Sequence, residues 1–175
     1  MYRTGSGMTL VETAITLAVA TIVAAVALPP LRSFVEHQRG IGVMQRLVAD
    51  MALARSRAVV QRQQVVVCPR GPALDCSKDA DWTRGWLVFT DPDGNRQPDA
   101  ESDLLRVADA PGPASRLRIS SSRSYLRYQS DGRSAHSNLT VRVCVGDSLA
   151  GAVVVNNHGR ARSTRQDRSA ACGGG

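Results

Sequence analysis

The feature that most constrains this 175-residue chain is an apolar segment near its N-terminus. Between Met8 and Leu28 the only charged residue is Glu12, and the other polar residues are threonines. As a helix these residues would extend about 31 Å, because each residue adds about 1.5 Å, and that length crosses the hydrocarbon core of a bilayer. Three structures are compatible with the segment: a transmembrane helix, a cleaved secretory signal and a buried core helix.

A cleaved secretory signal is supported by Arg3, which precedes the apolar residues, and by Ala25-Val26-Ala27, which is typical of a signal cleavage site. Two features count against it. The apolar segment is long for a signal core, and Glu12 lies inside it. A carboxylate in hydrocarbon costs about 2.5–3.5 kcal/mol, so we expect Glu12 to have a partner.

The sequence Gly7-Met8-Thr9-Leu10-Val11-Glu12 resembles the cleavage site of type IV prepilins, in which a short basic leader and a glycine precede an apolar stretch with glutamate at its fifth position. Pro29 falls near mature position 22, where proline recurs in that family. The resemblance implies that prepilin peptidase cleaves between Gly7 and Met8, and that Met8 becomes an N-methylated terminus at the inner membrane. It also implies that this amine neutralises Glu12 of a neighbouring subunit in a filament, an ion pair that specifies register more than it adds stability.

Beyond Pro29-Pro30, apolar residues recur at intervals of three and four, which predicts an amphipathic helix over residues 29–62. The apolar face consists of Leu31, Phe34, Val35, Ile41, Met44, Leu47, Val48, Met51, Ala58 and Val59, and the polar face of Arg32, Glu36, Arg39, Gln45, Arg46, Asp50 and Arg57. Gly40 and Gly42 mark either a soft point of this helix or a close packing contact.

Short β-branched and aromatic segments separated by turn residues follow the helix and predict antiparallel strands. The expected strands are 65–67, 85–89, 104–107, 117–119, 124–128, 139–143 and 152–155. Together these segments predict an α+β fold with a leader at 1–7, a transmembrane half-helix at 8–28, an amphipathic half-helix at 29–62, a β domain at 63–158 and a basic tail at 159–175.

Three segments resemble the FimT/GspH family of pilin-like proteins: Asp50–Ala58 followed by Gln64–Cys68, Gly85–Asp91 followed by Asp93-Gly94-Asn95, and Tyr128–Arg133. The resemblance extends from Gly7 to about Arg162. It implies the type IV pilin-like fold, with the long N-terminal helix packed on antiparallel sheets, and a place beside other pilins or pseudopilins in a filament.

The cysteines Cys68, Cys76, Cys144 and Cys172 allow three pairings into two disulfides. A domain displayed outside the inner membrane lies where disulfides persist. We favour Cys68–Cys76, which closes a short loop, and Cys144–Cys172, which holds the C-terminus onto a late strand. Free buried thiols are the alternative.

No motif of nucleophilic, phosphate-loop or zinc chemistry is found, so we expect neither an enzyme nor a cofactor. From Asp75 to Asp103 there are eight acidic and three basic residues, a net charge of 3 − 8 = −5. Asp91, Asp93, Asn95, Asp99 and Glu101 could surround a calcium ion, but their spacing is not that of an EF-hand loop. We expect a hairpin turn here and no metal site.

The basic tail is the most informative segment for function. The net charge of the chain is +7, and Lys78 is its one lysine. This arginine bias suits phosphate recognition, and it equally fits the codon usage of a GC-rich genome. The tail sequence Gly159-Arg160-Ala161-Arg162 matches the Gly-Arg-x-Arg motif of FimT-type minor pilins, which take up DNA in natural transformation. The match implies that Arg160 and Arg162 contact DNA, with Arg165 and Arg168 beside them.

An upstream basic region, Arg116, Arg118, Arg123, Arg127, Arg133 and Arg142, could extend that surface. The expected function is therefore that of a minor type IV pilin, which binds double-stranded DNA without sequence preference. The expected location is the inner membrane, with the C-terminal domain in the periplasm and at the cell surface after assembly. The alternative is a GspH-like pseudopilin of type II secretion, in which a basic tail is solvated or docks acidic subunits.

Overall fold

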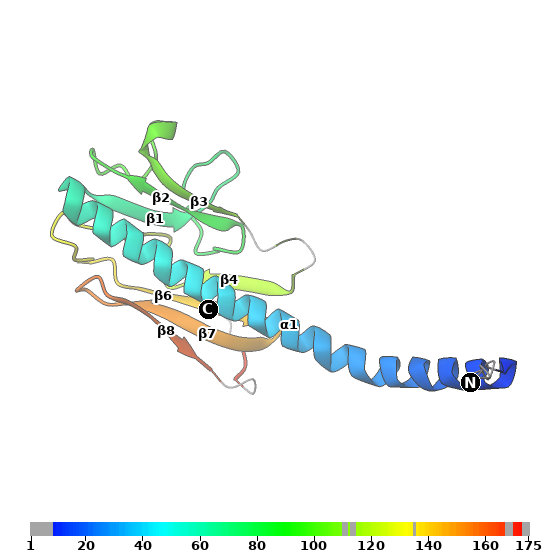
Figure 1. Cartoon of the computed structure of the whole chain (residues 1–175). Coiled ribbons are helices and arrows are strands. Elements are labelled where there is room, and N and C mark those ends of the chain that lie inside the picture. The colour runs from blue at the N-terminus through cyan, green and yellow to red at the C-terminus, as the bar shows by residue number, and fades with distance from the viewer. Residues whose placement is uncertain (1–8, 110–111, 113–114, 135, 167–169, 173–175) are drawn as a thin grey trace, which may run out of the picture. The chain divides into compact units, whose positions relative to one another are not determined.

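The computed structural model describes residues 9–109, 112, 115–134, 136–166 and 170–172. The chain forms two compact units, residues 1–35 and 36–175, each of which is considered by itself. Figure 1 shows the elements, which confirm the α+β class. They are α1 (Leu10–Gln61), β1 (Val65–Pro69), β2 (Gly85–Thr90), the short 3-10 helix η1 (Glu101–Asp103), β3 (Leu104–Asp109), β4 (Leu117–Ser121), β5 (Leu126–Tyr128), β6 (Leu139–Val145), β7 (Ser148–Val155) and β8 (Ala161–Arg165).

The first unit contains the N-terminal part of α1. Thr9 begins the helix, because its hydroxyl accepts a hydrogen bond from the Glu12 N–H at 3.3 Å. The hydroxyls of Thr13 and Thr16 donate to the carbonyls of Leu10 and Thr13 at 2.8 and 2.9 Å, which satisfies them within an apolar segment. The helix is long and apolar enough to cross a membrane, with a mean hydropathy of 2.2 over a window that is entirely exposed. It is therefore a candidate membrane anchor.

The second unit contains two four-stranded antiparallel sheets. The first sheet has the strand order β3-β2-β1-β5, and the second has the order β4-β6-β7-β8. Figure 1 shows both sheets along the C-terminal part of α1. Apolar side chains of both sheets and of α1 form one shared core, with Met44, Leu47, Met51, Ala54 and Ala58 as the fully buried helix residues.

The expected apolar face is confirmed from Ile41 to Ala58, but four of its predicted members are exposed: Leu31, Phe34, Val35 and Val59. Asp50 does not lie on the polar face as expected. It is only 5% exposed, and its carboxylate accepts a hydrogen bond from the indole Nε1 of Trp86 at 2.9 Å. Arg106 Nε lies 3.5 Å from the other carboxylate oxygen. A buried indole N–H needs an acceptor, and the Asp50 carboxylate of α1 is the acceptor for Trp86.

Gly40 is a close packing contact, one of the two roles expected for it. A Cβ atom there would lie 3.2 Å from Val145 Cγ2 and 3.3 Å from Ala150 Cβ. Helix and second sheet therefore approach closely at this residue. Gly42 has open space around its Cα and takes no part in the contact.

All seven expected strands are present, with ends that differ by a few residues. An eighth strand, β8, was not expected: the sheet does not end at residue 158, and Ala161–Arg165 pairs with β7 over five residues. The segment lacks the large apolar residues that mark a strand, because β8 is an edge strand with four of its five residues exposed. The first part of the expected basic tail is thus folded.

Candidate nucleic-acid interface

The Gly-Arg-x-Arg motif lies at the hairpin that joins β7 to β8. The Gly159 N–H donates to the Asn156 carbonyl at 2.8 Å, and the Arg160 N–H donates to the Asn156 side-chain oxygen at 3.1 Å. Gly159 has a φ of +76°, the left-handed conformation that closes three-residue hairpin loops. The motif glycine therefore forms the turn that presents both following arginines.

Gly159 is also packed against a second turn. A Cβ atom at Gly159 would overlap the Gly132 carbonyl oxygen and would lie 3.0 Å from Tyr128 Cε1. Gly132 in turn accepts a hydrogen bond from Arg55 Nε of α1 at 3.0 Å. Ser134 donates its N–H to the Asn157 carbonyl at 3.1 Å, which ties the two turns together. The turn before Arg160 is thus held by the end of the helix.

Arg160 and Arg162 lie on the face of the second sheet that points away from α1. Arg162 is opposite Val154, whose neighbours Val153 and Val155 point into the core. The Arg160 carbonyl accepts a hydrogen bond from the Asn156 N–H at 3.4 Å, so Asn156 and Arg160 add one more pair to the ladder between β7 and β8. Because strand residues two apart share a face, both side chains are on this outer face, and both are exposed.

Arg165 does not join them. It is opposite Gly151, and a Cβ atom at Gly151 would touch Met44 of α1, so Arg165 is on the face that carries the helix. Arg165 is three positions after Arg162, and an odd spacing in a strand places side chains on opposite faces. Arg168, the fourth expected DNA contact, lies outside the described residues.

Arg142 and Arg118 complete the outer face. Arg142 is opposite Ala152 of β7 and Ser120 of β4, and Arg118 is opposite Cys144 of β6. From Arg162 in β8 to Arg142 in β6, the row crosses two strand spacings and two residues, about 12 Å from Cα to Cα. From Arg142 to Arg118 it crosses one strand spacing and two residues, about 8 Å, because β6 pairs directly with β4. We name this row of four side chains, Arg160, Arg162, Arg142 and Arg118, the arginine diagonal.

The rest of the upstream basic region is not on this face. Arg127 belongs to β5 of the first sheet and is half-buried, with Nη1 3.4 Å from Gln64 Oε1. Arg116 lies against Gly146, at the turn between β6 and β7. Arg123 and Arg133 lie in turns and are exposed. Only Arg118 and Arg142 of the six therefore align with the tail arginines.

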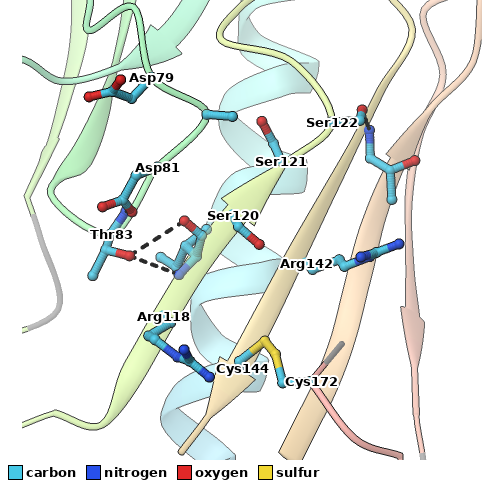
Figure 2. A pocket seen from close by; sticks show the side chains of 13 residues that line it. Asp79, Asp81, Thr83, Arg118, Ser120, Ser121, Ser122, Arg142, Cys144 and Cys172 are labelled. Atoms are coloured by element: carbon cyan, nitrogen blue, oxygen red, sulfur yellow. Dashed lines mark hydrogen bonds between the residues drawn. A yellow bond between two sulfur atoms is a disulfide. The ribbon is translucent and has the colours of Figure 1, made fainter. Parts of the chain in front are cut away.

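Acidic residues are found at one end of the arginine diagonal. Asp147 Oδ1 lies 4.0 Å from Arg118 Nη2, and both side chains are well exposed. Asp79 and Asp81 line a groove of about 810 Å³ together with Arg118 and Arg142 (Figure 2). The β4 end of the diagonal is thus partly neutralised, whereas no acid of the described residues pairs with Arg160 or Arg162.

Both expected disulfides are present. Cys68–Cys76 has a Cα–Cα distance of 5.5 Å, and Cys144–Cys172 has one of 6.0 Å. Figure 2 shows the Cys144–Cys172 bond beside Arg142 and Arg118. It holds the segment 170–172 on the turn between β6 and β7, where the Leu149 N–H donates to the Ala170 carbonyl and the Cys172 N–H to the Asp147 carbonyl, both at 2.8 Å.

The expected processing site, Gly7 and Met8, lies outside the described residues. Glu12 is described, in the first turns of α1, and its side chain is exposed in the first unit. The sequence indicated Arg162 and Arg165 but not the strand β8 that contains them. Asn156-Asn157-His158-Gly159 between two extended segments is typical of a three-residue hairpin loop and was the available signal.

Comparison with known proteins identifies the family. The family model described as type II transport protein GspH matches residues 43–159 and ends one residue before Arg160. The search of curated proteins found no match. One crystal structure of the type IV minor pilin FimU of Pseudomonas aeruginosa (strain PAO1) shares 21% identity with the chain. It aligns over 79% of this chain and 96% of that one, with a TM-score of 0.56.

A second crystal form of FimU gives 19% identity, 74% and 94% coverage and a TM-score of 0.51. At these identities the likeness concerns the fold, which is the type IV pilin fold in both proteins. The expected family and fold are confirmed, because the family model covers well over half of the chain and the helix packs on antiparallel sheets as it does in FimU. This chain belongs to the GspH family of type IV pilin-like proteins.

Proposed function

We propose that this GspH-family protein is a minor subunit of a type IV filament and binds double-stranded DNA through the arginine diagonal. The observation that supports the proposal is the alignment of Arg160, Arg162, Arg142 and Arg118 on one solvent-facing side of the second sheet. Guanidinium groups bind phosphate oxygens bidentately, and a row of them follows an extended polyanion better than a single cluster does.

The chemistry of this face favours backbone contacts over base readout. Strands β4, β6, β7 and β8 contain no aromatic residue on which a base could stack. A four-stranded sheet is also too broad to enter the major groove, which admits a helix or a two-stranded ribbon. We therefore expect binding that is independent of sequence, of micromolar or weaker affinity, and steeply dependent on salt.

The test is the affinity of the full-length chain, in detergent micelles, for a short labelled duplex across a salt series. Replacing Arg160 and Arg162 together by alanine is expected to lower the slope of log affinity against log salt by about two phosphate contacts, and R142A by about one. R165A is the matched control, because Arg165 lies in the same strand on the opposite face, and it should leave the slope nearly unchanged.

Full binding by the R160A/R162A variant would refute the assignment of the arginine diagonal. Equal losses in R165A and R162A would mean that the whole tail binds by net charge, without the face that we assign. An absence of binding at low salt would remove the DNA role and leave the family membership intact.

A second candidate is a structural subunit of a type II secretion pseudopilus, and the observation that favours it is the GspH family model itself. In that case the outer face of the second sheet would dock an acidic neighbouring subunit. Cross-linking in cells from a photoreactive residue at position 164, on the same outer face, separates the two candidates, since it would capture a pseudopilin in one case and DNA in the other.

We also propose that prepilin peptidase cleaves the Gly7–Met8 bond, that Met8 is then N-methylated, and that its amine pairs with Glu12 of a neighbouring subunit. The apolar part of α1, with Glu12 as its one acid, supports this proposal. Anchored in this way, the second unit would stand on the periplasmic side before assembly and at the cell surface afterwards.

A further inference from the structure

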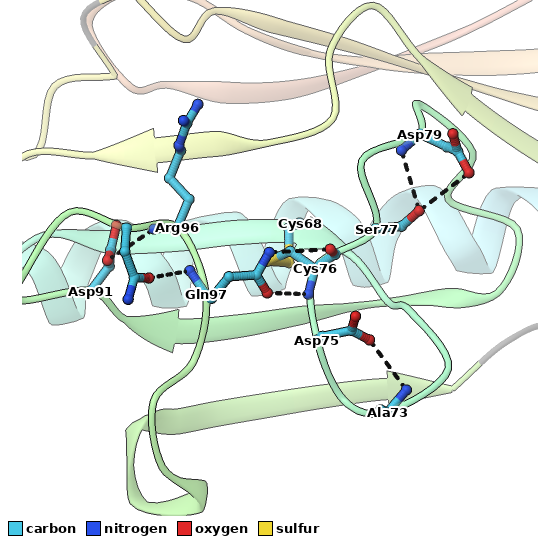
Figure 3. Close-up of a disulfide and its surroundings, with 10 residues drawn as sticks. Cys68, Ala73, Asp75, Cys76, Ser77, Asp79, Asp91, Arg96 and Gln97 are labelled. Atoms are coloured by element: carbon cyan, nitrogen blue, oxygen red, sulfur yellow. Dashed lines mark hydrogen bonds between the residues drawn. A yellow bond between two sulfur atoms is a disulfide. The ribbon is translucent and has the colours of Figure 1, made fainter.

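The loop between β2 and η1, residues 91–100, is a feature that the proposed function does not use. It lies over the face of the first sheet that points away from α1, and two contacts hold it there. Gln97 accepts a hydrogen bond from the Cys76 N–H at 2.8 Å and donates one to the Cys76 carbonyl at 3.3 Å (Figure 3). The Arg96 guanidinium stacks on Tyr125, 4.9 Å from the ring centre. The loop 91–100 is thus held through Gln97 to the backbone of Cys76, which the disulfide joins to Cys68 of β1.

Side-chain oxygens of this loop accept backbone hydrogen bonds in a regular series. Asp91 Oδ1 accepts from the Arg96 N–H at 3.2 Å, Asp93 Oδ1 from the Asn95 N–H at 3.2 Å, and Asn95 Oδ1 from the Gln97 N–H at 2.6 Å. Arg96 has a φ of +65°. The backbone therefore curls around the side chains of residues 91, 93 and 95.

This series corresponds to the ligand positions of a calcium loop. Such a loop takes oxygens from positions 1, 3 and 5, the backbone carbonyl of position 7 and the side chain of position 9, with a glycine at position 6 for the sharp turn. With Asp91 as position 1, positions 3, 5, 7 and 9 are Asp93, Asn95, Gln97 and Asp99. Position 6 is Arg96, which adopts the positive φ required there. Position 12, a bidentate glutamate in EF-hands, is Ser102, which is why the sequence alone did not indicate a site.

Asp91 supplies an independent indication of a ligand. Its side chain is fully buried, and Oδ2 has no hydrogen-bond partner among the described residues. A buried carboxylate oxygen without a donor, next to a second carboxylate, is an arrangement that a cation stabilises.

One amide group bridges two carboxylates of this loop. Asn95 Nδ2 donates to Asp93 Oδ2 at 2.7 Å and to Asp99 Oδ1 at 3.0 Å, so one amide group bridges them. Acidic side chains alone make no metal cluster in the described part of the chain. A hard cation, however, also uses amide and backbone oxygens, of which Asn95 and Gln97 offer one each.

We propose that the loop 91–99 binds a calcium ion through Asp91, Asp93, Asn95, Asp99 and the backbone carbonyl of Gln97. Calcium is favoured over magnesium because the loop offers many oxygens from flexible positions, whereas magnesium demands a strict octahedron of shorter bonds. With no ligand at position 12, we expect the weak class of affinity found in extracellular modules, about 10⁻⁴–10⁻³ M.

The experiment is a calorimetric titration of calcium chloride into the full-length chain in detergent, after removal of divalent ions, with terbium luminescence sensitised by aromatic residues as a second readout. Wild type should bind one ion, and D93N/D99N should bind at least tenfold more weakly. Both residues are exposed, so this variant is expected to fold. D79N is the matched control, since Asp79 lies in another acidic loop, and it should bind as wild type does.

D91N tests the buried ligand with an isosteric side chain, and it should lose calcium binding while keeping its circular dichroism spectrum. No heat of binding at millimolar calcium would overturn the proposal, as would equal affinity in wild type and D93N/D99N. Equal tightness for magnesium would overturn the choice of ion. The loop and the arginine diagonal are on different sheets, so failure here is independent of the DNA-binding test.

Discussion

At the scale of single residues, Gly159 is the position on which the presentation of the tail arginines depends most. Its φ of +76° disfavours any side chain, and its Cα faces the Gly132 carbonyl with no room for a methyl group. A side chain at Gly159 would therefore be unfavourable for two reasons, the positive φ and the overlap with Gly132. Each costs about 1–3 kcal/mol of folding free energy. A glycine before Arg160 is thus required by the fold, whatever the arginines bind.

Gly159→Ala is therefore expected to lower the free energy of unfolding by at least about 2 kcal/mol, measured by chemical denaturation. Gly42→Ala is its control. Gly42 lies inside α1 with open space around it, so alanine should raise the free energy of unfolding by about 0.5–1 kcal/mol. If both variants were equally stable, the packing of the β7–β8 hairpin on Gly132 would be wrong.

At the scale of elements, the two hairpins of the second sheet, β6–β7 and β7–β8, are stabilised by different interactions. Backbone hydrogen bonds hold the β7–β8 hairpin, whereas the turn between β6 and β7 has in addition the covalent bond from Cys144 to Cys172. The bridged residues are 28 apart in the chain, against 8 for Cys68 and Cys76. The larger closed loop constrains the unfolded chain more.

Replacing Cys144 and Cys172 together by alanine is expected to lower the free energy of unfolding by about 3.5 kcal/mol, and replacing Cys68 and Cys76 by about 2.5 kcal/mol, from loop-closure entropy. Hydrogen exchange should also become faster at Leu149, whose N–H bonds to the Ala170 carbonyl. A C144A/C172A protein with unchanged stability and unchanged exchange would show that the C-terminal segment docks without the disulfide.

At the scale of the whole molecule, the two units have different environments. The large apolar residues described in the first unit are exposed, as suits a lipid or a neighbouring helix, while most of those in the second unit are buried in two clusters. Glu12 is the one acid in the apolar part of α1, and such a residue is expected to have a partner where water is excluded.

The processing proposal predicts a mature protein that begins with N-methylated Met8. Mass spectrometry of the intact protein, purified from cells with and without prepilin peptidase, measures this directly. The mass should fall by that of residues 1–7 and rise by one methyl group only when the peptidase is present. An unprocessed N-terminus in the presence of the peptidase, or cleavage near Ala27, would contradict it.

The sequence by itself determined the features that depend on local pattern. The length of the apolar segment, the three-and-four spacing of Met44, Leu47 and Met51, and the β-branched segments reflect helix and strand geometry within a few residues. The spacing of Arg160 and Arg162 places them on one face only if the segment is extended, and the pairing with β7 supplies that condition. The sequence favoured the two observed disulfides over the other pairings and free thiols, and the structure decided between them.

Only the tertiary structure decided which distant residues share a surface. Arg118 and Arg142 join Arg162 because of the register between strands far apart in sequence. The pairing of β8 with β7 decides that Arg162 is on the outer face and Arg165 on the face that carries the helix. Asp50 is buried because Trp86 of the first sheet packs against it and donates a hydrogen bond to its carboxylate. Asp91 is buried because its loop folds back over the sheet. Each of these outcomes depends on contacts between separate elements, and local pattern carries no information about which elements will meet.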